Sequence, residues 1–153
     1  AMVAMAALLV GAVLGTMSRS GEEAAAIHAV RVPMCEAVVA EMHIEIHKHS
    51  LRRHGEDDVW ETVPAICLAI VQNYTLRSGP WRLDRRAVRL DDSDAGPAEY
   101  EHLLLLKAAC EAFTDEYQLE ISGALFASTA AGTSAQAAAA ALCPRLSPRP
   151  APQ

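Results

Sequence analysis

The sequence predicts a mainly all-α protein, a disulfide-linked bundle of helices that carries a small hairpin-like insert. Three long stretches place apolar residues at the spacing of a helix with one buried face. Apolar residues make up 52% of the 153-residue chain, but aromatic residues only 5%, and many of the apolar residues are alanines. Because alanine buries little surface, such a core is thin, and we expect covalent cross-links to support it.

The cysteines stand too far apart for a CxxC motif, so zinc-knuckle and thioredoxin-like sites lack their basic spacing. Wide spacing in a chain with a poor core favours long-range disulfides and therefore an oxidising compartment. Spacing alone leaves the alternative pairings open. The cysteines are Cys35, Cys67, Cys110 and Cys143.

The first element is an apolar segment, residues 1–17, without a charged residue. As a helix it would be about 25 Å long, just short of a hydrocarbon core of about 30 Å. A signal-peptide remnant is the alternative, but no basic region precedes the segment and no clean cleavage site follows it. We expect residues 1–20 to form a retained membrane anchor, in which small residues let another membrane helix approach closely. These small residues are Ala7, Gly11 and Gly15.

The next two elements are expected to be helices. The first covers residues 21–50, with an interruption near Pro33. Its core-facing stripe consists of Cys35, Val38, Val39, Met42 and Ile46, and its polar side of Glu36, Glu41, His43 and His47. After a loop over residues 52–58, Asp58 and Glu61 resemble a capping box that opens the second helix, which continues to Tyr74. Pro64 should kink this helix or mark its first turn.

Residues 78–97 are expected to form the insert, a small hairpin or irregular excursion. After Ser78-Gly79-Pro80, apolar and polar residues alternate as in short strands, with Trp81, Leu83, Val88 and Leu90 as the apolar ones. A third long helix should run from Glu99 to about Phe126, and an alanine-rich stretch, broken around residues 132–134, should reach Cys143. The domain thus covers residues 21–143, and the proline-rich residues 144–153 should form an extended tail.

The charge pattern argues against nucleic-acid binding. The net charge is −6, and the arginines of the insert alternate with aspartates, which predicts a solvated mixed patch. These arginines are Arg82, Arg85, Arg86 and Arg89.

Motifs for catalysis are missing from the sequence. No GxSxG, P-loop or dinucleotide-binding pattern occurs, and carboxylate pairs such as Glu116/Glu120 and Asp91/Asp92 are explained by solvent exposure. His43 and His47 have the spacing of two metal ligands on one helix face, but no third ligand accompanies them, so we predict neither a metal nor a cofactor. Trp81 is the residue that we assign to a partner surface.

Three segments resemble the cysteine-bearing helices of the canopy, or MIR-interacting saposin-like, family. They are CEAVVAEMHIEI (35–46), VWETVPAICLAIVQNY (59–74) and LKAACEAFTDEYQLEI (106–121), and the last is the most specific. The resemblance covers about residues 30–146, including the place of the insert, and it implies a saposin-like fold.

The family has six cysteines paired first to sixth, second to fifth and third to fourth. In this chain the first would fall near Val32 and the sixth near Pro150, and both are missing, so one whole bridge is absent. The resemblance therefore implies bridges Cys35–Cys143 and Cys67–Cys110.

These observations favour a non-enzymatic structural subunit. In this hypothesis a luminal domain is held to a membrane protein complex by residues 1–17 and by its own surface, in a thylakoid lumen or an intermembrane space. The resemblance implies the first alternative, a co-chaperone of the endoplasmic reticulum that assists the folding of membrane receptors. The second alternative is lipid binding of the saposin type.

Overall fold

The computed structural model of the chain describes residues 21–91 and 96–146. The expected anchor, residues 1–20 with Ala7, Gly11 and Gly15, lies outside the described residues, as do residues 92–95 and 147–153. Within the described ranges, no helix is both long enough and apolar enough to cross a membrane.

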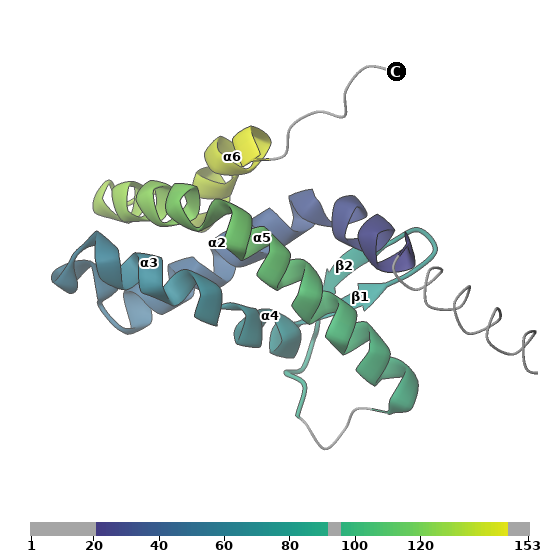
Figure 1. The fold of residues 1–153 in the computed structure, drawn as a ribbon. Coiled ribbons are helices and arrows are strands. Elements are labelled where there is room, and N and C mark those ends of the chain that lie inside the picture. Colours follow the sequence, from purple (N-terminus) through teal and green to yellow (C-terminus); the bar gives the residue numbers. More distant parts are fainter. Residues whose placement is uncertain (1–20, 92–95, 147–153) are drawn as a thin grey trace, which may run out of the picture.

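The described part of the chain is mainly helical, with one small two-stranded sheet, as the sequence predicts (Figure 1). A helix over residues 21–29 comes first, and α5 is the long central helix against which most of the others pack. The remaining elements are α2 (Arg31–Lys48), the short 3₁₀ helix η1 (Leu51–His54), α3 (Glu56–Ala65), α4 (Cys67–Asn73), β1 (Tyr74–Arg77), β2 (Arg82–Arg85), α5 (Pro97–Ala130) and α6 (Ala135–Leu146).

The interruption expected near Pro33 is confirmed. A turn at Val30 separates the helix over residues 21–29 from α2, and Pro33 occupies the first turn of α2. The backbone N–H groups of a first turn have no partner inside the helix, so proline loses nothing there. The expected apolar stripe of α2 is buried, but Glu41, which was placed on the polar side, is buried with it.

The predicted capping box is wrong. Helix α3 begins at Glu56, directly after Gly55, whose φ of 101° favours glycine, and Asp58 makes no side-chain cap. The acidic residues Glu56, Asp57 and Asp58 instead fill the first turn, where the helix dipole favours negative charge. Of the expected loop, residues 52–54 belong to the 3₁₀ helix η1 and residues 56–58 to α3.

Pro64 divides the second predicted helix into α3 and α4, with the break at Ile66. Proline has no N–H to donate to the carbonyl four residues earlier, which is that of Trp60. The side chain of Gln118 on α5 donates to this oxygen instead, at 2.8 Å. The local effect of a proline thus becomes a contact between α3 and α5.

The hairpin starts earlier than predicted. Strands β1 and β2 are antiparallel, with Tyr74 opposite Arg85 and Arg77 opposite Arg82. Its first strand, β1, consists of the last residue of the second predicted helix and the three residues before the predicted insert. These residues form a strand because Tyr74 and Leu76, which are buried, alternate with Thr75 and Arg77. The turn contains Gly79, with a φ of 81°, and Trp81.

The predicted second half of the insert differs as well. Leu83 lies in β2, but Val88 and Leu90 belong to irregular backbone. The Leu90 N–H donates to the carbonyl of Gln72 at 2.9 Å, so this segment is tied to the end of α4 and not to another strand.

Helix α5 continues past the expected end at Phe126 to Ala130, and it bends at Tyr117, whose φ and ψ are −119° and 17°. Arg31 spans the bend, since one of its nitrogens lies 2.7 Å from both Glu116 Oε2 and the Tyr117 hydroxyl. Gly132, with a φ of 70°, provides the predicted break before α6.

Residues 144–146 are helical, not part of an extended tail. Helix α6 runs through Pro144 to Leu146, which is buried in the core. Burial of a leucine side chain stabilises by about 1.5–3 kcal/mol, which favours continuing the helix by these three residues.

Candidate functional site

The cysteines join elements that lie far apart in the sequence. Cys35 on α2 is bonded to Cys143 on α6, across 108 residues, and Cys67 on α4 is bonded to Cys110 on α5, across 43 residues. These are the pairs that the resemblance implies. All four residues are buried, and no cysteine is left free.

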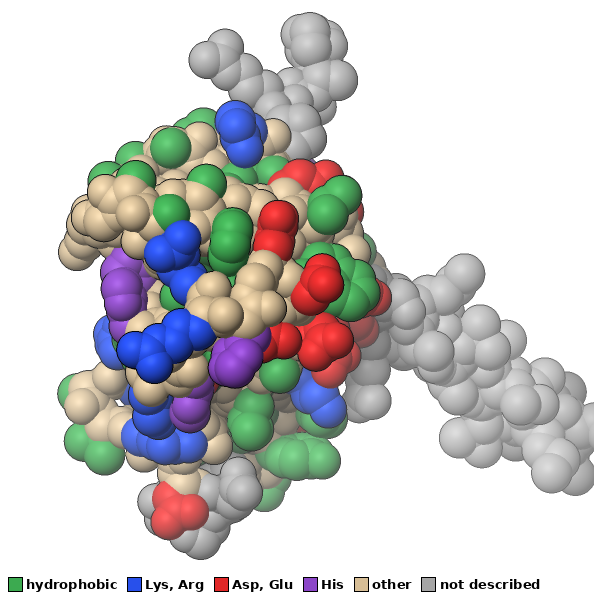
Figure 2. Space-filling model, turned by 90° about the vertical axis from the view of Figure 1, so that its left-hand side faces the viewer, with side chains coloured by type: hydrophobic (Ala, Val, Ile, Leu, Met, Phe, Trp, Pro, Cys, Tyr) green, Lys and Arg blue, Asp and Glu red, His purple; other side chains and the backbone are tan. Residues whose placement is uncertain are grey.

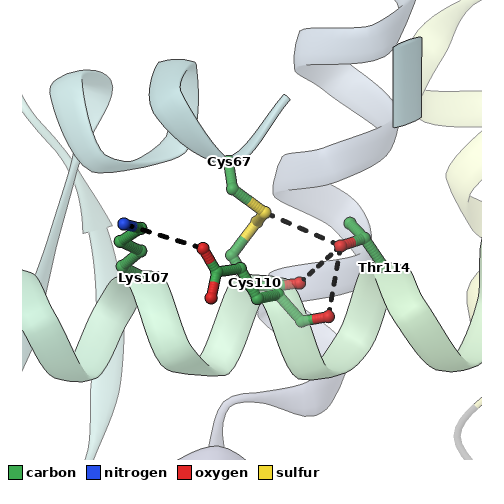
Figure 3. Close-up of polar contacts among 5 residues, drawn as sticks. Cys67, Lys107, Cys110 and Thr114 are labelled. Atoms are coloured by element: carbon green, nitrogen blue, oxygen red, sulfur yellow. Dashed lines mark hydrogen bonds and ion pairs between the residues drawn. A yellow bond between two sulfur atoms is a disulfide. The ribbon is translucent and has the colours of Figure 1, made fainter. Parts of the chain in front are cut away.

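The surroundings of the Cys67–Cys110 bridge are those of a structural disulfide (Figure 3). The Thr114 hydroxyl lies 3.7 Å from Cys67 Sγ and donates to the Cys110 carbonyl at 3.0 Å. The charged pair drawn beside it, Lys107 and Glu111, is exposed along α5, with its closest charged atoms 3.8 Å apart. Thiol exchange requires access to a sulfur atom, which burial prevents here.

Of the two histidines with the spacing of metal ligands, His43 makes a hydrogen bond between elements of the fold. His43 Nε2 lies 3.1 Å from the Thr133 carbonyl and donates to it, which ties α2 to the turn between α5 and α6. The His43 and His47 ring centroids are 4.5 Å apart, and His49 pairs with Glu45 at 3.2 Å. Among the residues that the structure describes, no three or more histidine, cysteine or acidic side chains are grouped so as to hold a metal ion.

Of the carboxylate pairs singled out in the sequence, only Glu116/Glu120 lies wholly within the described residues. Glu116 is engaged by Arg31 at 2.7 Å, and Glu120 is exposed. Asp91 is exposed, while Asp92 lies outside the described residues.

The arginines of the insert are matched by acidic or polar partners. Arg82 lies 3.2 Å from Asp84, which Arg77 of β1 also contacts at 3.2 Å. Arg85 lies 3.9 Å from Glu41, Arg86 bonds to Glu99 at 2.7 Å, and Arg89 bonds to Gln72. Another part of the surface mixes charges in the same way. Where η1 meets α3, Arg52, Arg53 and His54 are followed by three acids. On the face drawn in Figure 2, blue and purple side chains also lie beside red ones.

Glu41 is a buried carboxyl group that the sequence interpretation missed. Only 4% of the residue is exposed. Its Oε2 accepts a long 3.5 Å hydrogen bond from Asn73, while Oε1 has no hydrogen-bond partner among the described residues and lies 3.9 Å from an Arg85 nitrogen. Burial raises the pKa of Glu41, and Arg85 and Asn73 only partly oppose this shift. The sequence held a signal for the burial of Glu41, because it follows Ala37 and Val38 by one helical turn and both of these face the core.

A groove of about 400 Å³ opens beside Glu41, between α2, α4 and the end of the hairpin. Leu68 and Ile44 line it and are 68% and 47% exposed. Its charged lining residues have both signs: Lys48, Arg85, Arg89, Glu41 and Glu45. The mixture points to no particular ligand.

A second groove, called the Trp81 groove from here on, lies between residues 21–29, the hairpin turn and the first half of α5, and its volume is about 500 Å³. Figure 1 shows the purple helix over residues 21–29 running beside the hairpin. Trp81 is half-buried, packs against the core and meets His102 edge to face, with ring centroids 6.0 Å apart. The lining residues are Glu22, Glu23, Trp81, Glu101, His102, Leu104 and Leu105. The tryptophan assigned to a partner surface therefore lines a groove, although it belongs to the turn and not to a strand.

Comparisons of the chain with protein-family models, with curated proteins and with solved structures give no match.

Proposed function

We propose that the chain is a non-enzymatic accessory domain of a membrane protein complex, with a saposin-like fold of the canopy type, in an oxidising compartment. The observation that carries this proposal is the pair of buried disulfides, Cys35–Cys143 and Cys67–Cys110. A reducing compartment would not maintain such bridges, and their order is the one that the family resemblance implies.

The domain offers binding surfaces in place of a reaction centre. Two grooves flank the hairpin, and exposed apolar residues line both of them. Grooves on a rigid, cross-linked scaffold suit the holding of a partner polypeptide, because little ordering is needed when the partner binds. In this proposal residues 1–17 hold the domain to the membrane, and its surface contacts the other subunits.

Co-purification of the full chain from its own compartment tests the proposal. We expect wild-type protein to be recovered with a fixed set of membrane subunits, and deletion of residues 1–17 to reduce that recovery. Undiminished recovery would contradict the anchor, and recovery of no subunit would contradict the accessory role.

The second candidate, a co-chaperone for membrane receptors, is favoured by the disulfide order that the chain shares with the canopy family. It predicts a different outcome of the same experiment, namely transient recovery of immature receptors that are released once they have folded. Lipid recovered at a fixed ratio with the purified protein would instead indicate lipid binding of the saposin type.

A further inference from the structure

The Trp81 groove has walls of two chemical kinds, apolar side chains and carboxylates. We propose that this groove binds a basic amphipathic segment of a partner polypeptide, with lysine or arginine side chains on one face and apolar side chains on the other. The inference rests on the proposed function and adds to it the chemical class of the partner.

The negative charge of the groove is not neutralised within the part of the chain that the structure describes. Glu22, Glu23 and Glu101 line the groove, and no ion pair joins them to a basic side chain of the described residues. The nearby arginines of the hairpin are already engaged by Asp84 and Glu99. A groove lined by one sign of charge attracts and orients a segment of the opposite sign.

Trp81 adds a second attraction for a cation. Three other rings have an arginine over them, since Arg31 lies over Tyr117, Arg52 over Phe126 and Arg85 over Tyr74. No such cation lies over Trp81 in the described ranges. Tryptophan is the best ring for cation–π attraction, so a lysine or arginine that enters the groove has both a ring and carboxylates to contact.

The apolar part of the surface extends beyond the tryptophan along α5. Leu104 is 51% exposed, and the exposed Tyr100 lies one helical turn before it on the same face. A lone cation would leave these side chains in contact with water. A segment with an apolar face beside its basic face covers them, and this favours an amphipathic occupant.

The test uses the full chain with Trp60→Phe, so that Trp81 is the only tryptophan left of the two. The probe is a peptide of about 15 residues, or about four helical turns, with lysines on one face and leucines on the other. In the control peptide glutamates replace the lysines. We expect a saturable change in Trp81 fluorescence with the basic peptide alone, and binding that weakens as salt is added.

Two triple variants with the same change in charge locate the binding. Replacement of Glu22, Glu23 and Glu101 by glutamine should raise the dissociation constant about tenfold, because three attractive contacts are lost. The matched variant, with Glu61→Gln, Asp115→Asn and Glu120→Gln, changes exposed residues that do not line the groove and should leave the dissociation constant unchanged. Circular dichroism confirms that both variants fold.

The proposal is overturned by equal binding of the two peptides, by equal weakening in the two triple variants, or by no binding at all. A dimer of the free protein that the first triple variant dissociates would make a second copy the occupant, and this too would overturn it. A chain that recovers its subunits but ignores the basic peptide contradicts this inference alone. A chain that binds the peptide but recovers no subunit contradicts the proposed function alone.

Discussion

Glu41 shows how one buried residue sets a pH dependence. The charged carboxylate has lost water on burial, and its Oε1 gains no hydrogen bond in exchange from any residue that the structure describes. The folded state therefore raises the pKa of this group, mainly through burial. For an acid with a raised pKa, the stability of the folded state is greatest below the pKa of the unfolded chain and is lost as the pH rises through the pKa of the folded state.

Replacement of Glu41 by glutamine should therefore stabilise the protein at pH 7, by about 1 kcal/mol, since it removes an incompletely paired buried charge and keeps the size of the side chain. The gain should disappear as the pH falls toward the usual pKa of glutamate, where wild-type Glu41 is neutral as well. Urea unfolding at the two pH values measures both effects. Glu36→Gln, at an exposed residue of the same helix, is the control. A variant less stable than wild type at pH 7 would mean that the Arg85 contact outweighs burial.

Helices α3 and α5 are joined by a hydrogen bond at a carbonyl that Pro64 leaves without its helical partner. Because Pro64 has no N–H, the Trp60 carbonyl is free to accept from the Gln118 side chain of α5. Gln118→Ala should lower the free energy of unfolding by about 0.5–1 kcal/mol through loss of this bond. In a Pro64→Ala background the backbone N–H returns, so the same change should have a smaller effect. Urea unfolding of the four proteins completes the cycle, and equal effects in both backgrounds would show that the proline is not the cause of the contact.

The sequence predicts the helices well, because each has a continuous apolar face with the period of a helix. Helix α5 and the break at Gly132 are examples. The hairpin was predicted too late in the sequence because its first strand, Tyr74–Arg77, directly follows the helical pattern of α4. Four residues show too little alternation to mark where the helix ends and the strand begins. Trp81 was assigned to a partner surface from its expected place on a short strand, but the groove that it lines depends on residues 22 and 101, which only the fold brings together.

At the scale of the whole molecule, the two disulfides join two different pairs of helices. One joins α2, near the beginning of the described chain, to α6 at its end, and the other joins α4 to α5 across the hairpin. The core between them consists largely of alanine, valine, leucine and isoleucine, with Phe113 and Tyr74 as its aromatic members. Such a core leaves a small margin of stability, and the cross-links increase it by restricting the unfolded chain.

Replacement of each cysteine pair by alanine measures this contribution. In the chain-entropy model, loss of the bridge across 108 residues should lower the free energy of unfolding by about 5 kcal/mol, and loss of the bridge across 43 residues by about 4 kcal/mol. A domain of this size has about 5–15 kcal/mol in total, so each double variant should unfold at much lower urea, and the variant without both bridges should not fold. Urea unfolding of oxidised wild type and of each double variant gives the values, and wild type in added reductant should behave like the variant without both bridges. Mass-spectrometric mapping of unreduced peptides must also recover Cys35 with Cys143 and Cys67 with Cys110, since any other pairing would remove the basis for both the stability argument and the proposed compartment.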